Sequence, residues 1–311
     1  MHRYRIAGLT VSSDVEMPGA YAEGPDARAA EILIEAGPVP PQLADAVAVG
    51  PTWSMRPDQF LIRVPGVARF LLTGGRAIAY QLEPAAEPGD VVAFLVGTVF
   101  GILLHQRGLV VLHASGVELH GRAALFLGAS GAGKSTLAAA LAKRGHRLVT
   151  DDFCVVSLNA DGQPIVNPDG RLPKLWAQAI NHLDLGDRQG RPVRGRLAKF
   201  YMEQMATPAA TARPLPTGPV YALRETRAPL ESGIERPNVV DAALLLRQNA
   251  YRPRLIAQMD QGPLYFRVAA AIANSGGVFH LTRPMDFAAM PATIDQLERH
   301  WEGAQDRVGA A

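Results

Sequence analysis

The chain has little cysteine, little excess charge and no long hydrophobic run, and each shortage excludes a class of protein. It contains one cysteine, Cys154, among 311 residues, which excludes an intramolecular disulfide and a zinc site built from cysteines. The formal net charge is +2, so composition gives no indication of a surface for nucleic acid or for membrane. The N-terminal residues lack the apolar core of a signal peptide, and we expect a cytoplasmic protein.

The longest apolar stretch runs from Val91 to Leu104 and is interrupted by Gly97, Thr98 and Gly101. It is shorter than the roughly 20 residues that a helix needs to cross a bilayer. We therefore expect a buried helix rather than a membrane span. Hydrophobic residues make up 48% of the chain, which is enough for a packed core, and the length favours one or two domains.

The first third of the chain predicts a small β-rich domain. Short apolar runs, broken by glycine and proline, indicate strands at 4–11, 30–34, 60–64, 70–73 and 77–82. The turn-rich segment 83–90 predicts a boundary, which gives an N-terminal domain of residues 1–88 and a catalytic domain of residues 89–311. Two hypotheses stay open for the N-terminal part: it recognises a peptide along a sheet edge, or it simply covers the catalytic sheet.

The middle of the chain predicts an α/β core. Strands are expected at 109–114 and 123–127, with a turn at 120–122, followed by a glycine-rich loop and a helix from Lys134 to about Arg144. Further strands are expected at 153–158 and 164–166, joined by a hairpin turn at 159–162. Farther on, 207–219 reads as an irregular proline-rich connection, 220–223 as a strand, and 239–248 and 290–301 as helices. Strand, loop, helix and strand in this order indicate a βαβ unit in an α/β sheet.

The glycine-rich loop fits the pattern G-x-x-x-x-G-K-[ST] of phosphate-binding loops in full. Its glycines allow successive backbone amides to surround phosphate oxygens, and the helix that follows adds its positive end. A chance match in a chain of this length has odds of about one in a hundred. The candidate nucleotide-binding residues are Gly128, Ser130, Gly131, Ala132, Gly133, Lys134, Ser135 and Thr136. Lys134 would reach the β- and γ-phosphates, and the Ser135 hydroxyl would bind magnesium.

Two adjacent carboxylates, Asp151 and Asp152, follow an apolar strand soon after the predicted helix. Phosphate-loop enzymes keep a magnesium-binding carboxylate at such a position, and a second one suits proton removal from an incoming hydroxyl. The plain alternative is a solvated Asp-Asp turn at a strand end. His113 lies in the strand before the hairpin, where a histidine is more often a satisfied core residue than a catalytic one.

These residues together resemble a known family. The segment from Leu109 to Val156, LVVLHASGVELHGRAALFLGASGAGKSTLAAALAKRGHRLVTDDFCVV, is similar to the catalytic domain of bacterial HPr kinase/phosphorylase. The histidine, the hairpin, the phosphate loop and the sequence RGHRLVTDD occur in the order and spacing of that family. The resemblance implies a phosphate-loop kinase fold related to phosphoenolpyruvate carboxykinase, with ATP and Mg²⁺ as cofactors.

The resemblance also implies roles for individual residues. His113 and Asp151 look like the pair that handles the proton of a substrate serine, and Asp152 looks like the magnesium ligand beside Ser135. Lys134 would act on the transferred phosphoryl group. The implied reaction is transfer of the γ-phosphate to a Ser or Thr hydroxyl of a peptide or protein.

The chain departs from the family pattern downstream. The glutamate-bearing segment of the family is not recognisable, and the nearest stretch, Gly170 to Trp176, contains no carboxylate. Phosphorylase activity therefore does not follow from the resemblance, and HPr is not the expected acceptor. The chain is more similar to short HPr-kinase-like proteins, some of which accompany lasso-peptide biosynthesis and phosphorylate a precursor peptide. "RGLVVLHASGV" and "LPKLW" fit that group.

A basic run without acids extends from Arg188 to Lys199. Such a run is commonly a solvated face, but it would also suit contact with ATP phosphates or recognition of an acidic peptide. Other functions stay open: a small-molecule kinase, a non-catalytic ATP-binding module and a nucleotide-driven motor. The chain lacks the LSGGQ-like and N/T-K-x-D segments of ABC-type ATPases and GTPases. A homo-oligomer is compatible with these observations.

Overall fold

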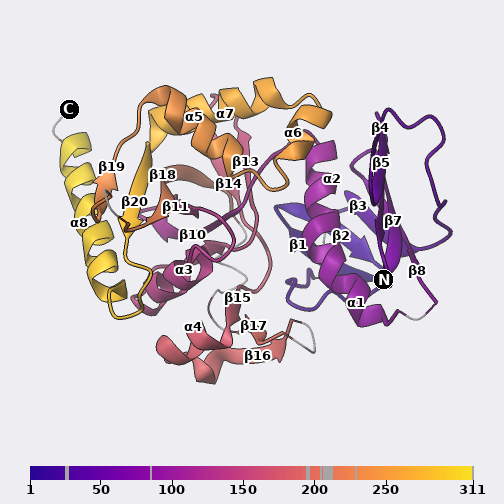
Figure 1. The fold of residues 1–311 in the computed structure, drawn as a ribbon, viewed down its shortest axis with the longest axis horizontal. Coiled ribbons are helices and arrows are strands. Elements are labelled where there is room, and N and C mark those ends of the chain that lie inside the picture. The colour runs from indigo at the N-terminus through magenta and orange to yellow at the C-terminus, as the bar shows by residue number, and fades with distance from the viewer. Residues whose placement is uncertain are drawn as a thin grey trace.

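The structure is a computed structural model that describes residues 1–24, 28–84, 86–193, 197–203, 205, 213–227 and 230–309, without the side chains of residues 88 and 304–309. Two large β-sheets lie beside each other, one formed by the N-terminal strands and one around the phosphate loop (Figure 1). The expected combination of a β-rich N-terminal part with an α/β part is confirmed.

The N-terminal sheet has eight strands in the order β1-β2-β3-β8-β7-β6-β5-β4. Most neighbours are antiparallel hairpins, but β3 runs parallel to both β2 and β8. Its strands are β1 (His2–Ile6), β2 (Leu9–Ser13), β3 (Ile32–Ala36), β4 (Ala48–Gly50), β5 (Trp53–Arg56), β6 (Gln59–Val64), β7 (Ala68–Thr73) and β8 (Ala77–Leu82).

A long apolar helix connects the two parts of the fold. It consists of α1 (Pro88–Phe94), the π-helical turn η1 (Leu95–Val99) and α2 (Phe100–Gln106). Within the described residues, the stretch Gly89–Gln106 meets the length and composition of a membrane span, and 67% of it is buried inside the fold. The helix shares one hydrophobic core with the N-terminal strands, which accounts for its apolar composition. A division of the chain at residue 88 stays a prediction.

The second sheet has the strand order β12-β10-β11-β18-β14-β13-β9, and β20 joins it beside β18, with β19 next to β20. β11 and β18 are parallel, as are β18 and β20. The strands are β9 (Val110–Leu112), β10 (Ala114–Leu119), β11 (Arg122–Leu127), β12 (Leu148–Thr150), β13 (Cys154–Leu158), β14 (Pro164–Asn167), β18 (Leu215–Glu225), β19 (Gly233–Glu235) and β20 (Val278–Arg283).

Helices cover both faces of this second sheet (Figure 1). One face packs against α5 (Val239–Gln248), α6 (Arg254–Gln258) and α7 (Gly262–Ser275). The other face packs against α3 (Lys134–Lys143) and α8 (Met290–Gly309). Both faces are therefore buried, as is usual for a sheet with parallel strands. The residue runs predicted as helices at 239–248 and 290–301 correspond to α5 and to the first part of α8.

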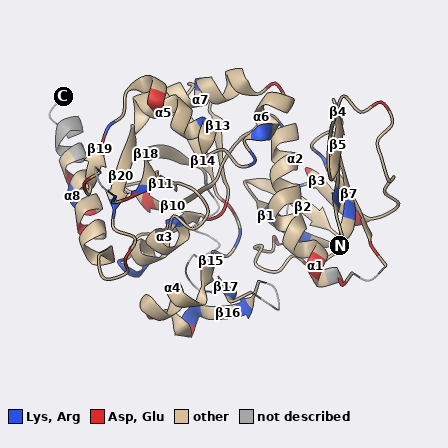
Figure 2. Cartoon of the chain, viewed as in Figure 1, with Lys and Arg blue, Asp and Glu red and all other residues tan. Residues whose placement is uncertain are grey.

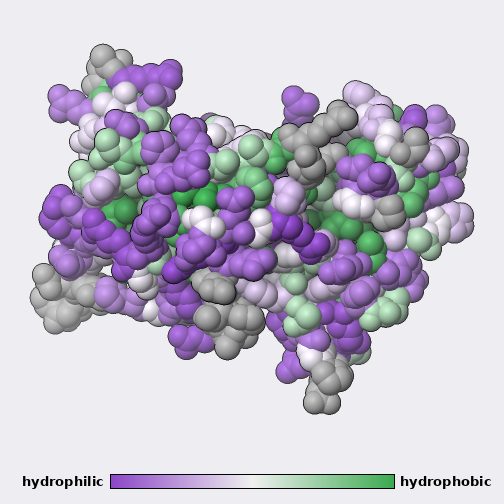
Figure 3. Space-filling model, turned by 90° about the horizontal axis from the view of Figure 1, so that it is seen from below, coloured by the Kyte–Doolittle hydropathy of each residue, from purple (hydrophilic) through white to green (hydrophobic). Residues whose placement is uncertain are grey.

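A small third sheet lies below the phosphate loop, with the strand order β15-β17-β16. It contains β15 (Lys174–Trp176), β16 (Gln189–Pro192) and β17 (Lys199–Met202), next to α4 (Ala177–His182) and the 3₁₀ turn η2 (Gly186–Arg188). Basic residues gather on this sheet (Figure 2). Seen from below, the molecule is mainly hydrophilic, with smaller hydrophobic areas between the polar residues (Figure 3).

Two strand predictions were wrong in detail. The run 4–11 is not one strand but the hairpin β1–β2, because Ala7 and Gly8 have φ angles of 53° and 81° and reverse the chain. The run 109–114 is divided at His113, whose backbone N–H donates to the Asn249 carbonyl at 2.7 Å. The strand before this point pairs with β13, whereas the strand after it pairs with β11 and β12.

The proline-rich segment 207–219 was also misread. Residues 207–212 lie outside the described residues, but Leu215 to Pro219 form the first half of β18. Pro216 lies opposite Ile165 in that strand, and Thr217 lies opposite Ala123. Prolines near the start of a strand are compatible with strand pairing. The proline-rich composition of the segment therefore gave no indication of this strand. Strands β4, β5, β15, β16, β17, β19 and β20 and helices α4, α6 and α7 were not predicted.

Candidate active site

The phosphate loop occupies residues 128–133 between β11 and α3, as the sequence predicts. Gly128, Gly131 and Gly133 have φ angles of 151°, 86° and 79°, conformations that residues with a Cβ adopt rarely. A Cβ on Gly133 would meet the guanidinium of Arg283. The glycines are therefore required by the backbone conformation of the loop, and Gly133 caps the N-terminus of α3.

Lys134 lies along this loop, nearly buried. Its Nζ donates hydrogen bonds to the carbonyls of Gly128, at 2.8 Å, and Ala129, at 3.0 Å. Burial lowers the pKa of Lys134, while the nearby carboxylates of Asp151 and Asp152 oppose the shift. The ammonium group thus belongs to the same charged cluster as the two aspartates.

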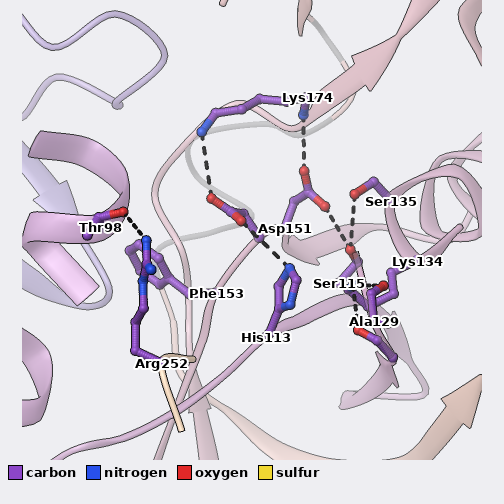
Figure 4. A network of polar contacts seen from close by, with 12 residues as sticks. Thr98, His113, Ser115, Ala129, Lys134, Ser135, Asp151, Phe153, Lys174 and Arg252 are labelled. Carbon is purple, nitrogen blue, oxygen red and sulfur yellow. Dashed lines mark hydrogen bonds and ion pairs between the residues drawn. The ribbon is translucent and has the colours of Figure 1, made fainter. Parts of the chain in front are cut away.

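Asp151 follows the end of β12, and each of its carboxylate oxygens accepts a hydrogen bond. Its Oδ1 accepts a hydrogen bond from Ser115 Oγ at 2.7 Å, and its Oδ2 accepts one from the backbone N–H of Lys174 at 3.1 Å. Ser115 Oγ also lies 3.5 Å from Ser135 Oγ, so a chain of hydroxyls connects Asp151 to the phosphate loop (Figure 4). Asp151 is therefore the carboxylate on the side of Ser135.

Asp152 occupies a strained position and contacts a different set of groups. Its φ angle is 76°, which is uncommon for a residue other than glycine and characteristic of functional sites. Its Oδ1 lies 4.0 Å from His113 Nε2, and its Oδ2 lies 3.8 Å from Lys174 Nζ. Burial would raise the pKa of Asp152, but the positive charges of Lys174 and Arg171 hold it below its usual range.

His113 stands at the junction between β9 and β10, and its ring lies edge-on to Tyr251, with centroids 6.2 Å apart. Burial and the charge of Lys134 lower the pKa of His113, although the two aspartates act in the opposite direction. A neutral imidazole beside a carboxylate is suited to proton transfer at neutral pH. Within ion-pair distance, the partner of His113 is Asp152, whereas the resemblance implies Asp151.

A buried ion pair holds the backbone of Asp151 in place. Arg171 and Asp169 form a bidentate pair, and the side chains of both are 3% exposed. Arg171 Nη2 donates to the Asp151 carbonyl at 3.1 Å, and the Asp151 N–H donates to Asp169 Oδ2 at 3.1 Å. The guanidinium also lies 3.6 Å over the Phe153 ring and donates to the Val96 carbonyl in η1. The backbone of Asp151 is thus fixed between two buried charges.

These groups surround a cavity of about 160 Å³ beside the phosphate loop. The sequence-predicted residues that line it are His113, Ser130, Gly131, Gly133, Lys134, Ser135, Thr136, Asp151 and Asp152. Lys174, Leu175, Trp176 and Lys199 complete the lining. Gly128 and Ala132 belong to the loop but not to the lining. The structure therefore brings together residues from five separate segments of the sequence.

The basic run separates into parts with different surroundings. Arg194 and Arg196 lie outside the described residues. Arg191 lies 4.0 Å from Glu16, whereas Lys199 lines the cavity, and its Nζ lies 5.7 Å from the centre of the Trp176 ring. One member of the run, Lys199, thus faces the site where phosphate is expected.

Sequence reasoning missed Ser115, Lys174 and the pair formed by Asp169 and Arg171. Ser115 and Lys174 contact Asp151 across 36 and 23 residues of sequence, a separation that no local pattern reveals. A partial signal was available for Asp169 and Arg171, since an acid and an arginine next to an apolar run are expected to pair when buried. The segment 170–176, which lacks a carboxylate, places Lys174 in the cavity instead.

The residues present fit a magnesium ion that is held jointly with a nucleotide. Among the described residues, no group of three or more His, Cys, Asp or Glu side chains is arranged to hold a metal. Mg²⁺ typically binds one or two carboxylates together with substrate phosphates and water. Ser135, Asp151 and Asp152 supply such oxygen donors at one end of the cavity.

Comparison with known proteins identifies a related segment. A model of the family described as HPr Serine kinase C-terminal domain matches residues 108–177. HPr kinase/phosphorylase of an Exiguobacterium species is 33% identical over 130 residues, which is 39% of this chain and 38% of that protein. The protein of the same name from Clostridium beijerinckii is 44% identical over 75 residues, and that from Bacillus subtilis 43% over 75 residues; each match covers 24% of this chain and 23% of the relative.

These matches leave most of each relative uncovered, since the chain spans less than two fifths of the length of the curated relatives. Among solved structures, the HPr(Ser) kinase/phosphatase from Coxiella burnetii aligns with a TM-score of 0.35 and 14% identity, over 63% of this chain and 98% of that one. The matched segment 108–177 contains His113, the phosphate loop and both aspartates. Through this segment, which carries the whole candidate site except Lys199, the chain is similar to HPr kinases.

Proposed function

We propose that this protein is a magnesium-dependent kinase that transfers the γ-phosphate of ATP to a Ser or Thr hydroxyl of a peptide or protein. The observation that carries the proposal is the convergence of Lys134, Ser135, both aspartates and His113 on one cavity. Phosphoryl transfer requires little covalent chemistry from a protein and depends mainly on positioning and on charge neutralisation. The amides of the loop, Lys134 and a magnesium ion would hold the phosphates.

The contacts favour roles for the two carboxylates that are opposite to those implied by the resemblance, in which Asp151 takes the proton and Asp152 binds magnesium. Asp151 is linked through Ser115 to Ser135, the residue that would bind the metal. Asp152 lies beside His113, and a carboxylate next to a neutral imidazole suits removal of a proton from an acceptor hydroxyl. On this geometry, Asp151 with Ser135 holds the metal, and Asp152 with His113 acts on the acceptor.

The finer part of the proposal concerns the acceptor. The resemblance to the short HPr-kinase-like proteins favours a precursor peptide, such as that of a lasso peptide. Lys174 and Lys199 add two positive charges to the lining of the cavity, on the small sheet β15-β17-β16. Positive groups at this place suit both the transferred phosphoryl group and an acidic stretch of an acceptor peptide.

The test is label transfer from γ-labelled ATP to a candidate precursor peptide, followed by mass spectrometry. Asp152→Asn is expected to slow transfer by roughly 10²–10⁴-fold at saturating magnesium, because the base is lost. Asp151→Asn is expected to raise the magnesium concentration needed for half-maximal transfer. Asp161→Asn, in the exposed turn between β13 and β14, is the matched control and should behave as the wild type.

Each alternative has its own result. Nucleotide binding without transfer to any peptide, but with transfer to a small hydroxyl compound, would identify a small-molecule kinase. Binding without any transfer would identify a non-catalytic module. If Asp151→Asn alone abolished transfer at every magnesium concentration while Asp152→Asn shifted the magnesium requirement, the carboxylates would have the roles that the resemblance implies.

A further inference from the structure

A second cavity, of about 270 Å³, opens beside the phosphate loop and has no role in the chemistry described so far. It shares Gly131, Gly133, Thr136 and Trp176 with the cavity that contains the aspartates. Its remaining lining comes from α4 and from the segment that runs from the end of β20 to the start of α8: Gln178, Ala179, Arg283, Met285, Asp286, Phe287 and Met290. Together, the two spaces reach the volume of about 300–1,000 Å³ that is typical of small-molecule sites.

The shared residues fix the direction in which a bound triphosphate would run. His113, Asp151, Asp152 and Lys174 line the first cavity but not the second. The γ-phosphate must lie next to those groups for transfer to occur. The opposite end of the nucleotide therefore leaves the first cavity past Thr136 and enters the second.

Arg283, at the end of β20, is a buried charge for which the described residues supply no counter-charge. The residue is 3% exposed, and its Nη2 donates to the Ala132 carbonyl of the phosphate loop at 2.9 Å. Its Nε makes no hydrogen bond within the described part of the chain. Glu225 lies opposite Arg283 in the strand register but pairs with Arg227 at 2.6 Å. Asp286, which also lines the cavity, accepts from the Ala288 N–H.

A buried guanidinium is normally paired with an acid or an anionic ligand, since removing an unpaired charge from water is costly. Burial lowers the pKa of Arg283, and no carboxylate contributes in the opposite direction. Arg283 contacts the phosphate loop and lines the second cavity. A phosphate group of the bound nucleotide would therefore be close enough to neutralise its charge. Arginine is suited to this role because it forms directed hydrogen bonds to phosphate oxygens.

The walls of the second cavity suit a flat aromatic ring. Trp176 is 52% exposed and Met285 is 45% exposed, although both are large and apolar. Phe287 stacks on His182 with ring centroids 4.1 Å apart, which fixes its orientation at the cavity wall. Aromatic rings and methionine sulfur make favourable contacts with π systems such as a nucleobase.

We propose that the second cavity is the nucleoside subsite of the nucleotide, in which the base lies among Trp176, Met285 and Phe287 while Arg283 neutralises a non-transferred phosphate. The inference rests on the nucleotide-binding part of the proposed function. It assigns two further roles: Arg283 binds the substrate, and the loop between β20 and α8 recognises the nucleoside.

The experiment compares ATP with inorganic tripolyphosphate, each with Mg²⁺, by the shift in melting temperature that each produces. The wild type should be stabilised by ATP at concentrations at least about tenfold lower than those of tripolyphosphate. Arg283→Met should weaken ATP binding by at least about tenfold, the loss expected for one charged hydrogen-bonding group. Without ligand, this variant should melt at the wild-type temperature or above it, because an unpaired buried charge has been removed. The control is Arg267→Met, an exposed arginine on α7.

A merely structural role of Arg283 predicts the reverse pattern. The ligand-free variant would then melt earlier, through loss of the bond to Ala132, and its response to ATP would match that of the wild type. That pattern would overturn the role proposed for Arg283.

A second readout follows the base itself. ATP, but not tripolyphosphate, should change the fluorescence of Trp176, and Trp176→Phe should abolish that change. The double variant Met285→Ala, Phe287→Ala should bind ATP and tripolyphosphate with similar affinity. Equal stabilisation of the wild type by both ligands would overturn the subsite and leave the phosphate loop as a binding site. Failure of both ligands to bind would overturn nucleotide use, and the proposed function with it.

Discussion

Replacing Arg171 with methionine tests how strongly the buried ion pair supports the active site. Arg171 donates to Asp169, to the Val96 carbonyl and to the Asp151 carbonyl, and it lies over the Phe153 ring. Arg171→Met keeps an unbranched apolar stem but leaves the Asp169 carboxylate buried without its counter-charge. The same substitution removes the hydrogen bond that Arg171 donates to the Asp151 carbonyl.

The expected loss of stability follows from this burial. Breaking a buried ion pair by removing one partner typically costs about 3–5 kcal/mol, because the other charge remains desolvated. Burial raises the pKa of Asp169, whereas the Arg171 contacts and the Asp151 N–H act in the opposite direction. Without Arg171, the carboxylate either stays ionised and desolvated or takes up a proton, and both outcomes cost stability. We therefore expect Arg171→Met to lower the free energy of unfolding by an amount in that range.

The assay is urea unfolding followed by circular dichroism, with three variants compared with the wild type. Asp169→Asn removes the other charge, and the double variant removes both. Since the double variant has no unpaired buried charge, its loss should be smaller than the sum of the two single losses, by about 2 kcal/mol. The control is Arg63→Met, in an exposed pair with Glu83, which should leave the unfolding midpoint nearly unchanged. Additive losses, or a loss below about 1 kcal/mol for Arg171→Met, would refute the reasoning.

Three further predictions concern other parts of the chain. Gly170→Ala should destabilise the fold by roughly 1–3 kcal/mol in thermal unfolding, since the φ angle is 74° and a Cβ would meet the Arg5 carbonyl; no change would contradict this contact. Burial holds the pKa of His105 below its unfolded value of about 6.5. The unfolded chain therefore binds the proton first, and stability is lost as pH falls below about 6.5, by at most about 1.4 kcal/mol per pH unit. His105→Gln should make the dependence of unfolding free energy on pH shallower between pH 7 and 5, and an unchanged slope would exclude His105 as its source. Asn238→Ala removes the side chain that accepts from the Asp241 N–H at the start of α5 and should cost about 1 kcal/mol in urea unfolding, whereas Asn238→Asp should cost less.

Sequence alone predicted the parts of the site that depend on local conformation. The glycines of the phosphate loop are set by backbone angles within six residues, and Asp151 and Asp152 follow a strand that is apolar because it is buried. The apolar stretch from Val91 was also predicted as a buried helix, and the helix that contains it is mostly buried, although Gly89–Gln106 is long enough for a membrane span. These features need no knowledge of distant partners.

The rest depends on contacts that the chain makes only when it is folded. Lys174 reaches Asp152 because β15 pairs with β17, and no periodicity in LPKLW indicates that pairing. The hairpin between β1 and β2 was missed because Ala7, a residue that usually avoids positive φ, occupies the turn. The sequence left open whether His113 is a core residue or a catalytic one, and the 4.0 Å distance from its Nε2 to Asp152 Oδ1 comes only from the structure.

The helix formed by α1, η1 and α2 has a consequence for experiments with shortened chains. Its stretch Gly89–Gln106 has a mean hydropathy of 1.6 and is covered by the N-terminal strands. A fragment that starts near residue 86 would present this surface to water, to chaperones and to other copies of itself. Its inactivity would then report aggregation and would carry no information on peptide recognition. Substitutions at Val49 in the edge strand β4 and at Val47 just before it, both already exposed, change the sheet edge without uncovering the helix. Such variants would test the hypothesis of peptide recognition at the sheet edge while the apolar helix stays covered.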